Sequence, residues 1–176
     1  VTSFVDTEDD HYNIVPRAIG PRGWAKDGSA VILYDNWDLW KVPVDPRAGR
    51  AVNLTGNGKR DGIRYRTLYD WAGATDEEEA AAPGGGGRGG AGGAAAGIDL
   101  SKPMFIGTYG ERTKKEGVAK VEPTAPGAKM LAFEDARLGI TKARNADVFA
   151  FSRQTFTQYP DWWVSTSPTL ADPVRL

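Results

Sequence analysis

Apolar residues recur along this chain in short runs, many of which alternate apolar and polar positions, with turn residues between them. The run at 31–34 follows the turn sequence Lys26-Asp27-Gly28-Ser29, and further runs cover 39–44 and 50–55. Strand-forming β-branched and aromatic residues fill these runs, and Gly, Pro, Asp and Asn fill the gaps. The connections are too short for a crossover, so the three strands are predicted to form an antiparallel meander.

The same pattern returns in the second half of the chain. Strands are predicted at 104–109, 117–121, 129–133, 146–153, 161–165 and 173–176. Additional outer strands are predicted at 63–68 and 139–143. A helix is the alternative for 134–143, but Gly139 and Thr141 disfavour it. The whole pattern therefore predicts an all-β fold.

The predicted strands repeat at a spacing typical of one architecture. Leu39, Val118 and Trp163 mark the middle strands of three sets and are separated by about 79 and about 45 residues. Without the insertion described next, the first spacing falls to about 50. Repeats of about 40–50 residues built from short antiparallel strands are typical of propeller blades. We therefore predict a partial β-propeller, with about three blades forming an open arc.

One segment breaks the strand pattern. Residues 80–97 are Gly or Ala except for Pro83 and Arg88, and they contain nine of the 22 glycines. The acidic run 76–79 precedes them. Such a segment buries too little apolar surface to offset the entropy of ordering it, so 73–98 is predicted to be a disordered insertion.

This insertion divides the predicted propeller into blades within 1–72 and 99–176. Its glycines do not form a phosphate-binding loop, because the Gly-Lys-Ser/Thr ending that binds phosphate and metal is missing. Arg88 alone is not the repeated basic and aromatic pattern of an RNA-binding segment.

Composition excludes several classes of chemistry. The 176 residues contain no Cys and one His, His11, which removes disulfides, thiolate nucleophiles and multi-histidine metal sites. The formal charge of −1 provides no field for nucleic acid or anionic membranes. No apolar run reaches 18 residues, so no membrane span is predicted. Six Trp indicate that a compact core exists outside the insertion.

Two segments of the first half resemble known blade motifs. Residues 24–31, W-A-K-D-G-S-A-V, resemble the W-S-P-D-G-K-x-I/V opening of WD-like blades in the TolB and prolyl oligopeptidase families. Residues 38–45 followed by 51–55 resemble the half-blade "D-x-W-x-V/x-x-D-G…x-x-L-T" of the same families. Ala25-Lys26 replaces the family's Ser-Pro, and Pro46-Arg47 replaces its Gly, which lengthens that hairpin.

A third motif lies near the end of the chain. Residues 156–165, followed by 173–176, resemble the "x-S-P-D-x-Y-V-x-D…x-x-L-T" blade found just ahead of the catalytic domain in bacterial prolyl-oligopeptidase-type enzymes. The Thr that ends this motif does not follow Leu176. The resemblance covers most of the chain outside the insertion and implies a propeller truncated at both ends.

The resemblance implies a function that depends on a larger protein. Enzymes of the prolyl oligopeptidase and dipeptidyl-peptidase family hydrolyse peptides with a Ser-His-Asp triad on an α/β-hydrolase domain. Its nucleophile sits in a G-x-S-x-G elbow, and no Ser of this chain lies in one. His11, the only possible general base, is expected to be an exposed loop residue. We therefore expect no catalytic, cofactor-binding or metal-binding residue here.

The expected role is to gate or present peptide substrate to the hydrolase domain of a parent enzyme. The sequence does not give the compartment, and the family resemblance favours a periplasmic or secreted enzyme. A TolB-like propeller that binds protein without hydrolase activity is the alternative. A propeller that binds or hydrolyses carbohydrate through its Trp faces is a third hypothesis. The sequence that flanks this chain discriminates between peptidase and binding module.

Acidic and aromatic residues offer the remaining candidate sites. The spacing of the first group of carboxylates matches no calcium loop, so a solvated acidic segment is predicted. This group is Asp6, Glu8, Asp9 and Asp10. Residues Glu77-Glu78-Glu79 lack the aromatic setting of the glutamate pair with which dipeptidyl peptidases hold a substrate amino terminus, so that role is not assigned to them.

Tryptophan and aspartate are expected to serve the fold. Packing between sheets, rather than a ligand cleft, is predicted for Trp37, Trp40, Trp162 and Trp163. Trp162 and Trp163 are adjacent in a strand, so their side chains are predicted to face opposite sides. A role as turn residues that bond their own backbone is predicted for Asp27, Asp45 and Asp161.

Overall fold

The protein is described from a computed structural model, which covers residues 3–8, 15, 17–69, 71 and 97–176. Across these residues, strands form three four-stranded antiparallel sheets, and helix is confined to two short segments. The predicted all-β fold is confirmed. In the part of the chain that the structure describes, no helix is both long and apolar enough to cross a membrane.

Sheet 1 is formed by the first four strands in chain order. They are β1 (Gly23–Trp24), β2 (Ala30–Tyr34), β3 (Leu39–Pro43) and β4 (Val52–Asn53). The 3-10 helix η1 (Pro46–Ala48) lies in the connection between β3 and β4, and the short helix α1 (Gly58–Asp61) leads out of the sheet. Each strand pairs only with its chain neighbours, as the predicted meander requires.

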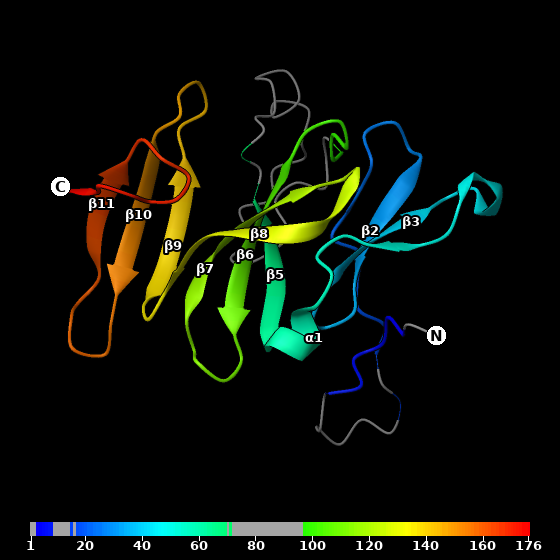
Figure 1. Ribbon diagram of the computed structural model, residues 1–176, viewed down its shortest axis with the longest axis horizontal. Coiled ribbons are helices and arrows are strands. Elements are labelled where there is room, and N and C mark those ends of the chain that lie inside the picture. Colours follow the sequence, from blue (N-terminus) through cyan, green and yellow to red (C-terminus); the bar gives the residue numbers. More distant parts are fainter. Residues whose placement is uncertain (1–2, 9–14, 16, 70, 72–96) are drawn as a thin grey trace.

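Sheets 2 and 3 repeat this order. Sheet 2 contains β5 (Ile63–Tyr69), β6 (Met104–Gly110), β7 (Glu116–Glu122) and β8 (Ala125–Glu134). Sheet 3 contains β9 (Arg137–Lys142), β10 (Phe149–Gln154), β11 (Asp161–Ser165) and β12 (Val174–Arg175). Figure 1 shows the sheets side by side in chain order along the longest axis, with sheet 2 in the centre.

Sheet 2 buries both of its faces because its apolar residues do not strictly alternate with polar ones. Along β7, Val118 and Ala119 are both fully buried although neighbouring side chains in a strand point to opposite faces. Ala119 packs in a core shared with sheet 1, and Val118 packs in a core shared with sheet 3. The central sheet therefore holds the three sheets together.

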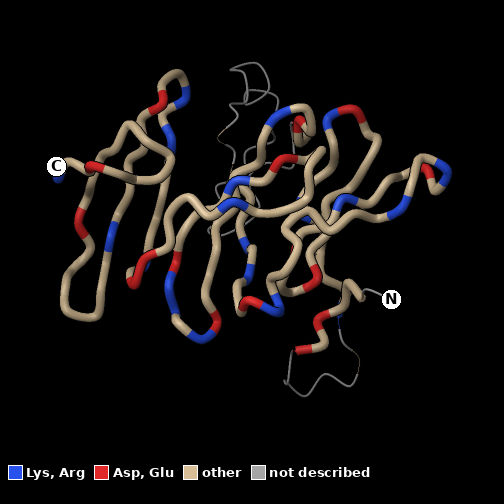
Figure 2. Tube along the Cα trace, viewed as in Figure 1, with Lys and Arg blue, Asp and Glu red and all other residues tan. Residues whose placement is uncertain are grey.

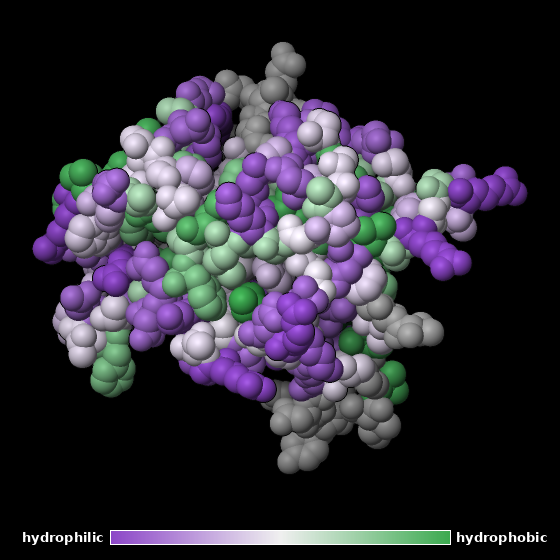
Figure 3. All heavy atoms as spheres, viewed as in Figure 1, coloured by the Kyte–Doolittle hydropathy of each residue, from purple (hydrophilic) through white to green (hydrophobic). Residues whose placement is uncertain are grey.

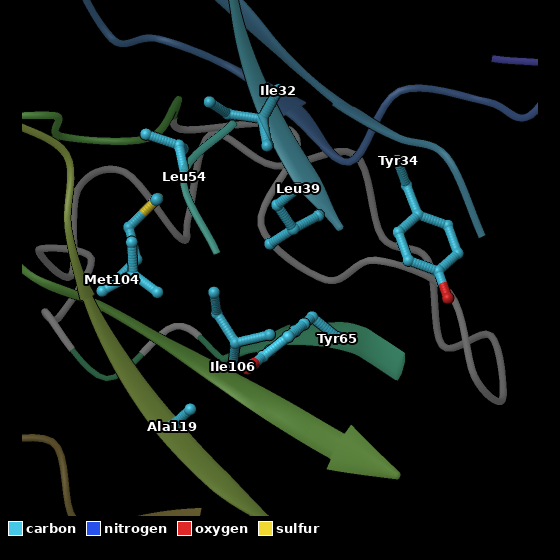
Figure 4. Packing of buried hydrophobic residues seen from close by; sticks show 9 residues of the cluster. Ile32, Tyr34, Leu39, Leu54, Tyr65, Met104, Ile106 and Ala119 are labelled. Atoms are coloured by element: carbon cyan, nitrogen blue, oxygen red, sulfur yellow. The ribbon is translucent and has the colours of Figure 1, made fainter. Parts of the chain in front are cut away.

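The core between sheets 1 and 2 is built from aliphatic and tyrosine side chains. Figure 4 shows Ile32 and Leu39 of sheet 1 facing Met104 and Ile106 of sheet 2. Ile32 and Ile106 are completely buried. Full burial of such a side chain contributes about 1.5–3 kcal/mol, so this contact is a main source of stability.

The core between sheets 2 and 3 is more aromatic. Trp71 stacks on Tyr69 with ring centroids 4.9 Å apart and meets Phe149 of β10 edge-on at 5.0 Å. Leu138 and Phe151 join them from sheet 3. Trp71, two positions after the last residue of β5, therefore fastens sheet 3 to the centre of the molecule.

Most predicted strands occur where the pattern placed them. The weakest, 139–143, overlaps β9, which ends at Lys142, so the strand interpretation was right and the helical alternative was wrong. The runs 50–55 and 173–176 yield only two-residue strands, β4 and β12. Helix α1 was not predicted. Leu39, Val118 and Trp163 each lie on the third strand, in chain order, of their sheets.

The predicted insertion, 73–98, lies almost entirely outside the described residues. Gly97 and Ile98, assigned to its end, are described. The amide of Ile98 donates to the Trp24 carbonyl at 2.7 Å, and the Ile98 carbonyl accepts from Lys26 at 2.9 Å. Ile98 also packs against the core between sheets 1 and 2. The chain therefore rejoins the packed fold beside the β1–β2 turn.

Candidate functional site

A pocket of about 500 Å³ opens at one end of sheet 3. One wall is the hairpin between β10 and β11, which contributes Gln158, Tyr159 and Pro160. The sheet itself provides the remaining lining residues, Arg153, Asp161, Trp163 and Arg175. The volume lies within the range of about 300–1,000 Å³ that is typical of small-ligand sites.

Strand register explains why the lining residues meet. Arg153 pairs directly with Asp161, and Trp163 pairs directly with Arg175, so each pair lies on one face of the sheet. Asp161 and Trp163 are two residues apart in β11 and share that face. Three strands thus place two guanidinium groups, one carboxylate and one indole side by side.

Ion pairs hold the polar lining in place. Arg153 donates through Nε to Glu134 of β8 at 2.8 Å and through Nη1 to Gln158 at 3.4 Å. Arg175 forms an ion pair through Nη2 with Asp161. Figure 2 shows both charge signs across β10 and β11, and the two signs are interspersed along the rest of the trace. The pocket therefore offers charged groups of both signs beside aromatic ones.

The aromatic side chains of this region differ in exposure. Tyr159 is 94% exposed and Phe156, on the same hairpin, is fully exposed. Trp163 is half-buried because it packs against the core between sheets 2 and 3. The pocket thus has a fixed aromatic floor and an exposed aromatic side chain on its rim.

A second polar cluster joins sheets 1 and 2 around Arg64. Its guanidinium lies 4.2 Å from the centroid of the Trp37 ring, pairs with Glu8 at 2.7 Å and also pairs with Glu111. Nη1 donates to the Asn36 carbonyl at 3.2 Å. These contacts connect the N-terminal segment, the β2–β3 turn, β5 and the β6–β7 hairpin.

The pKa shifts in this cluster follow from the same contacts. Burial acts to raise the pKa of Glu8, but hydrogen bonds from Trp37 and Arg64 outweigh burial and lower that pKa. The hydrogen bond from Arg64 lowers the pKa of Glu111. Burial acts to lower the pKa of Arg64, yet both carboxylates together raise it. Every charge here has a partner, so the cluster cross-links the fold.

Two of the three aspartates predicted to be turn residues adopt that role, whereas Asp161 is the first residue of strand β11. Asp27 accepts from the Ser29 amide at 2.9 Å, and Asp45 accepts from the Arg47 amide at 2.8 Å. Asp161 accepts from the Trp162 amide at 2.9 Å. Asp161 also lines the pocket and pairs with Arg175, which the sequence did not reveal because the partner lies on another strand.

The tryptophans were predicted to pack between sheets rather than to line a ligand cleft, and the structure agrees with this in part. Trp162 is 53% exposed whereas Trp163 packs inward, so the predicted opposite orientation is confirmed. Trp40 meets Phe4 edge-on at 6.2 Å and donates to Asp35 at 2.7 Å. Trp37 donates to Glu8 at 2.7 Å. Trp163 lines the pocket of sheet 3.

The sequence predicted that the acidic N-terminal segment is solvated, but two of its carboxylates contact the folded sheets. Asp6 accepts from the Asn36 side chain at 2.9 Å, and Glu8 belongs to the Arg64 cluster. Asp9, Asp10, His11 and Glu77-Glu78-Glu79 lie outside the described residues. Within the described ranges, no three His, Asp or Glu side chains are arranged to hold a metal ion.

Two of the sequence motifs occupy different places in their sheets. Asp27-Gly28 forms the turn between the first and second strands of sheet 1, with Gly28 at φ 71°. Pro160 ends the connection between the second and third strands of sheet 3, and Asp161 is the first residue of the third strand, β11. The resemblance of 156–165 to a blade opening therefore does not carry over to its position in the sheet.

Comparisons with known proteins yielded no relative. No family model matches the chain, and no curated protein or solved structure is significantly similar to it.

Proposed function

We propose that this chain is a non-catalytic segment of a β-propeller that belongs to a prolyl-oligopeptidase-like serine peptidase. In this role it gates or presents peptide substrate to an α/β-hydrolase domain elsewhere in the parent protein. The proposal rests on the blade-like units and on the resemblance of residues 24–31, and of 38–45 followed by 51–55, to the blades of that family.

The main observation that supports a propeller is the packing of three equivalent sheets against one another. Each sheet is a four-stranded meander in the same chain order, and each interface between sheets is an apolar core. In propellers, four-stranded blades pack face to face in the same way. The units and their packing thus agree with successive blades.

The outward faces of the two flanking sheets support the same arrangement. On sheet 1, Val31 pairs with Val42 beside Trp24, which is 49% exposed. On sheet 3, Val164 pairs with Val174, which is 67% exposed. Figure 3 shows apolar side chains at the end of the molecule where β11 lies. Additional blades would cover these faces.

A protein-binding module of the TolB-like kind is the second candidate. The exposed aromatic residues of the β10–β11 hairpin favour it, because Phe156 and Tyr159 present large apolar surfaces to solvent. Contiguous exposed apolar groups are typical of surfaces that contact other proteins. This candidate needs no hydrolase domain.

The test is to obtain the complete coding region and assay the encoded protein. We expect a G-x-S-x-G elbow followed by Asp and His, peptide hydrolysis by the whole protein, and loss of hydrolysis when the elbow serine is replaced by alanine. The present chain alone should not cleave peptides. A complete protein without the elbow would overturn the peptidase proposal and favour the binding module.

A further inference from the structure

We propose that the pocket of sheet 3 binds a peptide through a carboxylate that stands next to an apolar residue. The choice of a peptide rests on the function proposed above, whereas the need for a carboxylate rests on the pocket alone. The ligand's carboxylate meets Arg175, and its apolar side chain lies between Trp163 and the Tyr159-Pro160 wall.

Arg175 is the charged side chain of the pocket that has hydrogen-bond donors available for a ligand. A guanidinium has five N–H donors, arranged as a fork that fits a carboxylate. Among the residues that the structure describes, the Arg175 side chain forms an ion pair with Asp161 through Nη2, and it is 68% exposed. Its remaining donors are open to an anion that enters the pocket.

Arg153 has a different role. Its Nε and Nη1 are engaged by Glu134 and Gln158, and its side chain is 36% exposed. Two of its three nitrogens are engaged, so Arg153 fixes the hairpin wall against β8. Each arginine is paired with one carboxylate, but Arg175 is the more exposed and has one nitrogen engaged, so it is the guanidinium more accessible to a ligand carboxylate.

The apolar part of the ligand is accommodated by rigid and exposed aromatic groups together. Trp163 is held by its packing against the core between sheets 2 and 3, so its ring offers a fixed surface. Tyr159 and Pro160 line the same pocket from the β10–β11 hairpin. Aromatic and proline surfaces lose little conformational freedom when they bind, which favours an apolar residue between them.

The register of the sheet places the carboxylate-binding group, Arg175, and the aromatic surface, Trp163, close enough together for one ligand to contact both. Trp163 and Arg175 are direct cross-strand partners, and such pairs have Cβ atoms about 4.5–5.5 Å apart. A carboxylate and the side chain of the same or the adjacent residue span a similar distance. The pocket thus selects both groups in one short segment.

Binding is tested by calorimetry on the full chain with three acetylated tripeptides. The first is Ala-Ala-Phe with a free C-terminal carboxylate, the second is its C-terminal amide, and the third is Ala-Asp-Phe amide. We expect the first or third to bind at least about tenfold more tightly than the second, because a charge-assisted hydrogen bond is lost in the amide. Preference between the first and third identifies a terminal or a side-chain carboxylate.

Two variants locate the binding site. Arg175→Gln should weaken binding of the preferred peptide at least about tenfold, and Tyr159→Ala should weaken it about threefold to tenfold. Both positions are largely exposed, so the fold should survive, as circular dichroism can verify. Arg47→Gln, at an exposed position in η1 of sheet 1, is the matched control and should bind like the parent chain.

The inference would be overturned if neither carboxylate peptide bound more tightly than Ala-Ala-Phe amide, if none of the three peptides bound, or if Arg47→Gln weakened binding as much as Arg175→Gln. None of these results affects the test of the proposed function, which depends on the hydrolase elbow of the complete protein. Conversely, a complete protein without an elbow would leave the calorimetric result for the pocket intact.

Discussion

Gly117 of β7 faces Ala132 of β8 so closely that a Cβ atom at position 117 would lie 1.9 Å from the Ala132 carbonyl oxygen. The obstacle is main chain, which cannot rotate away as a side chain can. Val118 and Ala119, the next two residues of β7, reach into the two cores on either side of sheet 2. The spacing of β7 and β8 therefore affects the whole molecule.

Gly117→Ala should destabilise the protein by about 3 kcal/mol or more, because β7 and β8 must separate to admit the methyl group. Gly20→Ala is the control, since a Cβ there meets nothing within 4 Å and Gly20 does not have a positive φ. Urea denaturation of both variants measures the difference. Similar midpoints for the two would contradict the close approach.

The Arg64 cluster makes stability depend on pH in the acid range. The pKa values of Glu8 and Glu111 are lower in the folded protein than their ordinary value of 4.5, so the unfolded chain binds more protons. Their contribution is present above pH 4.5 and is lost as the pH falls through the lowered values. The melting temperature should therefore fall as the pH decreases from about 5 to about 3.

Glu8→Gln combined with Glu111→Gln should make this part of the curve less steep, because two carboxylates with lowered pKa values are gone. Other carboxylates whose pKa values are also lowered remain, and these include Asp27, Asp61 and Asp99. Glu122→Gln is the matched control, since Glu122 pairs with Lys120 outside the cluster. Thermal melts across the acid range compare the three proteins. An unchanged slope in the double variant would show that other groups cause the acid sensitivity.

Ile98 and the glycine-rich segment before it should respond differently to mutation. Ile98→Ala should cost about 2 kcal/mol, because its side chain packs against the core and fills the space beside Gly23. Deleting residues 80–91 should change the unfolding free energy by less than about 1 kcal/mol, since loop length has a weak effect on closure entropy.

Both variants are compared with the parent chain by urea denaturation. Gly97 is retained in the deletion, because it has φ 74° and a Cβ there would lie 2.7 Å from Cα of Lys26. A large loss of stability in the deletion variant would mean that the removed residues contribute to the fold. That result would overturn the insertion hypothesis.

The strands were predictable because their signal is local. Alternation, β-branched residues and Gly or Asp turns all lie within one run, as at 31–34 with its Asp27 turn, where Asp27 accepts from Ser29. Leu39, Val118 and Trp163 were predicted to lie on the middle strands of three sets, and each lies on the third strand of a four-stranded sheet. Ile98 was missed because one apolar residue after a Gly-rich tract has no pattern.

The candidate site was not predictable for a physical reason. Arg153, Asp161 and Arg175 meet because three strands pair in one register, and pairing partners cannot be read from any single strand. The Arg64 cluster depends on Glu8 and Glu111, which lie far from Arg64 in sequence. In the sequence, each of these charged residues looks like an ordinary solvent-exposed surface residue.

The outward face of sheet 3 predicts how the chain behaves in solution. Trp162 is 53% exposed, and Val174 and Leu176 are 67% and 76% exposed. Val164 pairs with Val174, and the Leu176 amide donates to the Trp162 carbonyl at 3.0 Å, so these residues lie close together. Apolar groups gathered on one face favour association.

The isolated chain should therefore self-associate as its concentration rises, and its melting temperature should rise with concentration because association stabilises the folded state. Trp162→Lys combined with Val174→Lys should shift sedimentation toward the monomer. Val44→Lys is the control, because Val44 is 54% exposed and lies just beyond β3 of sheet 1. A monomer with a sharp, concentration-independent melting transition would contradict the prediction, since the sheet would then be stable without a covering partner.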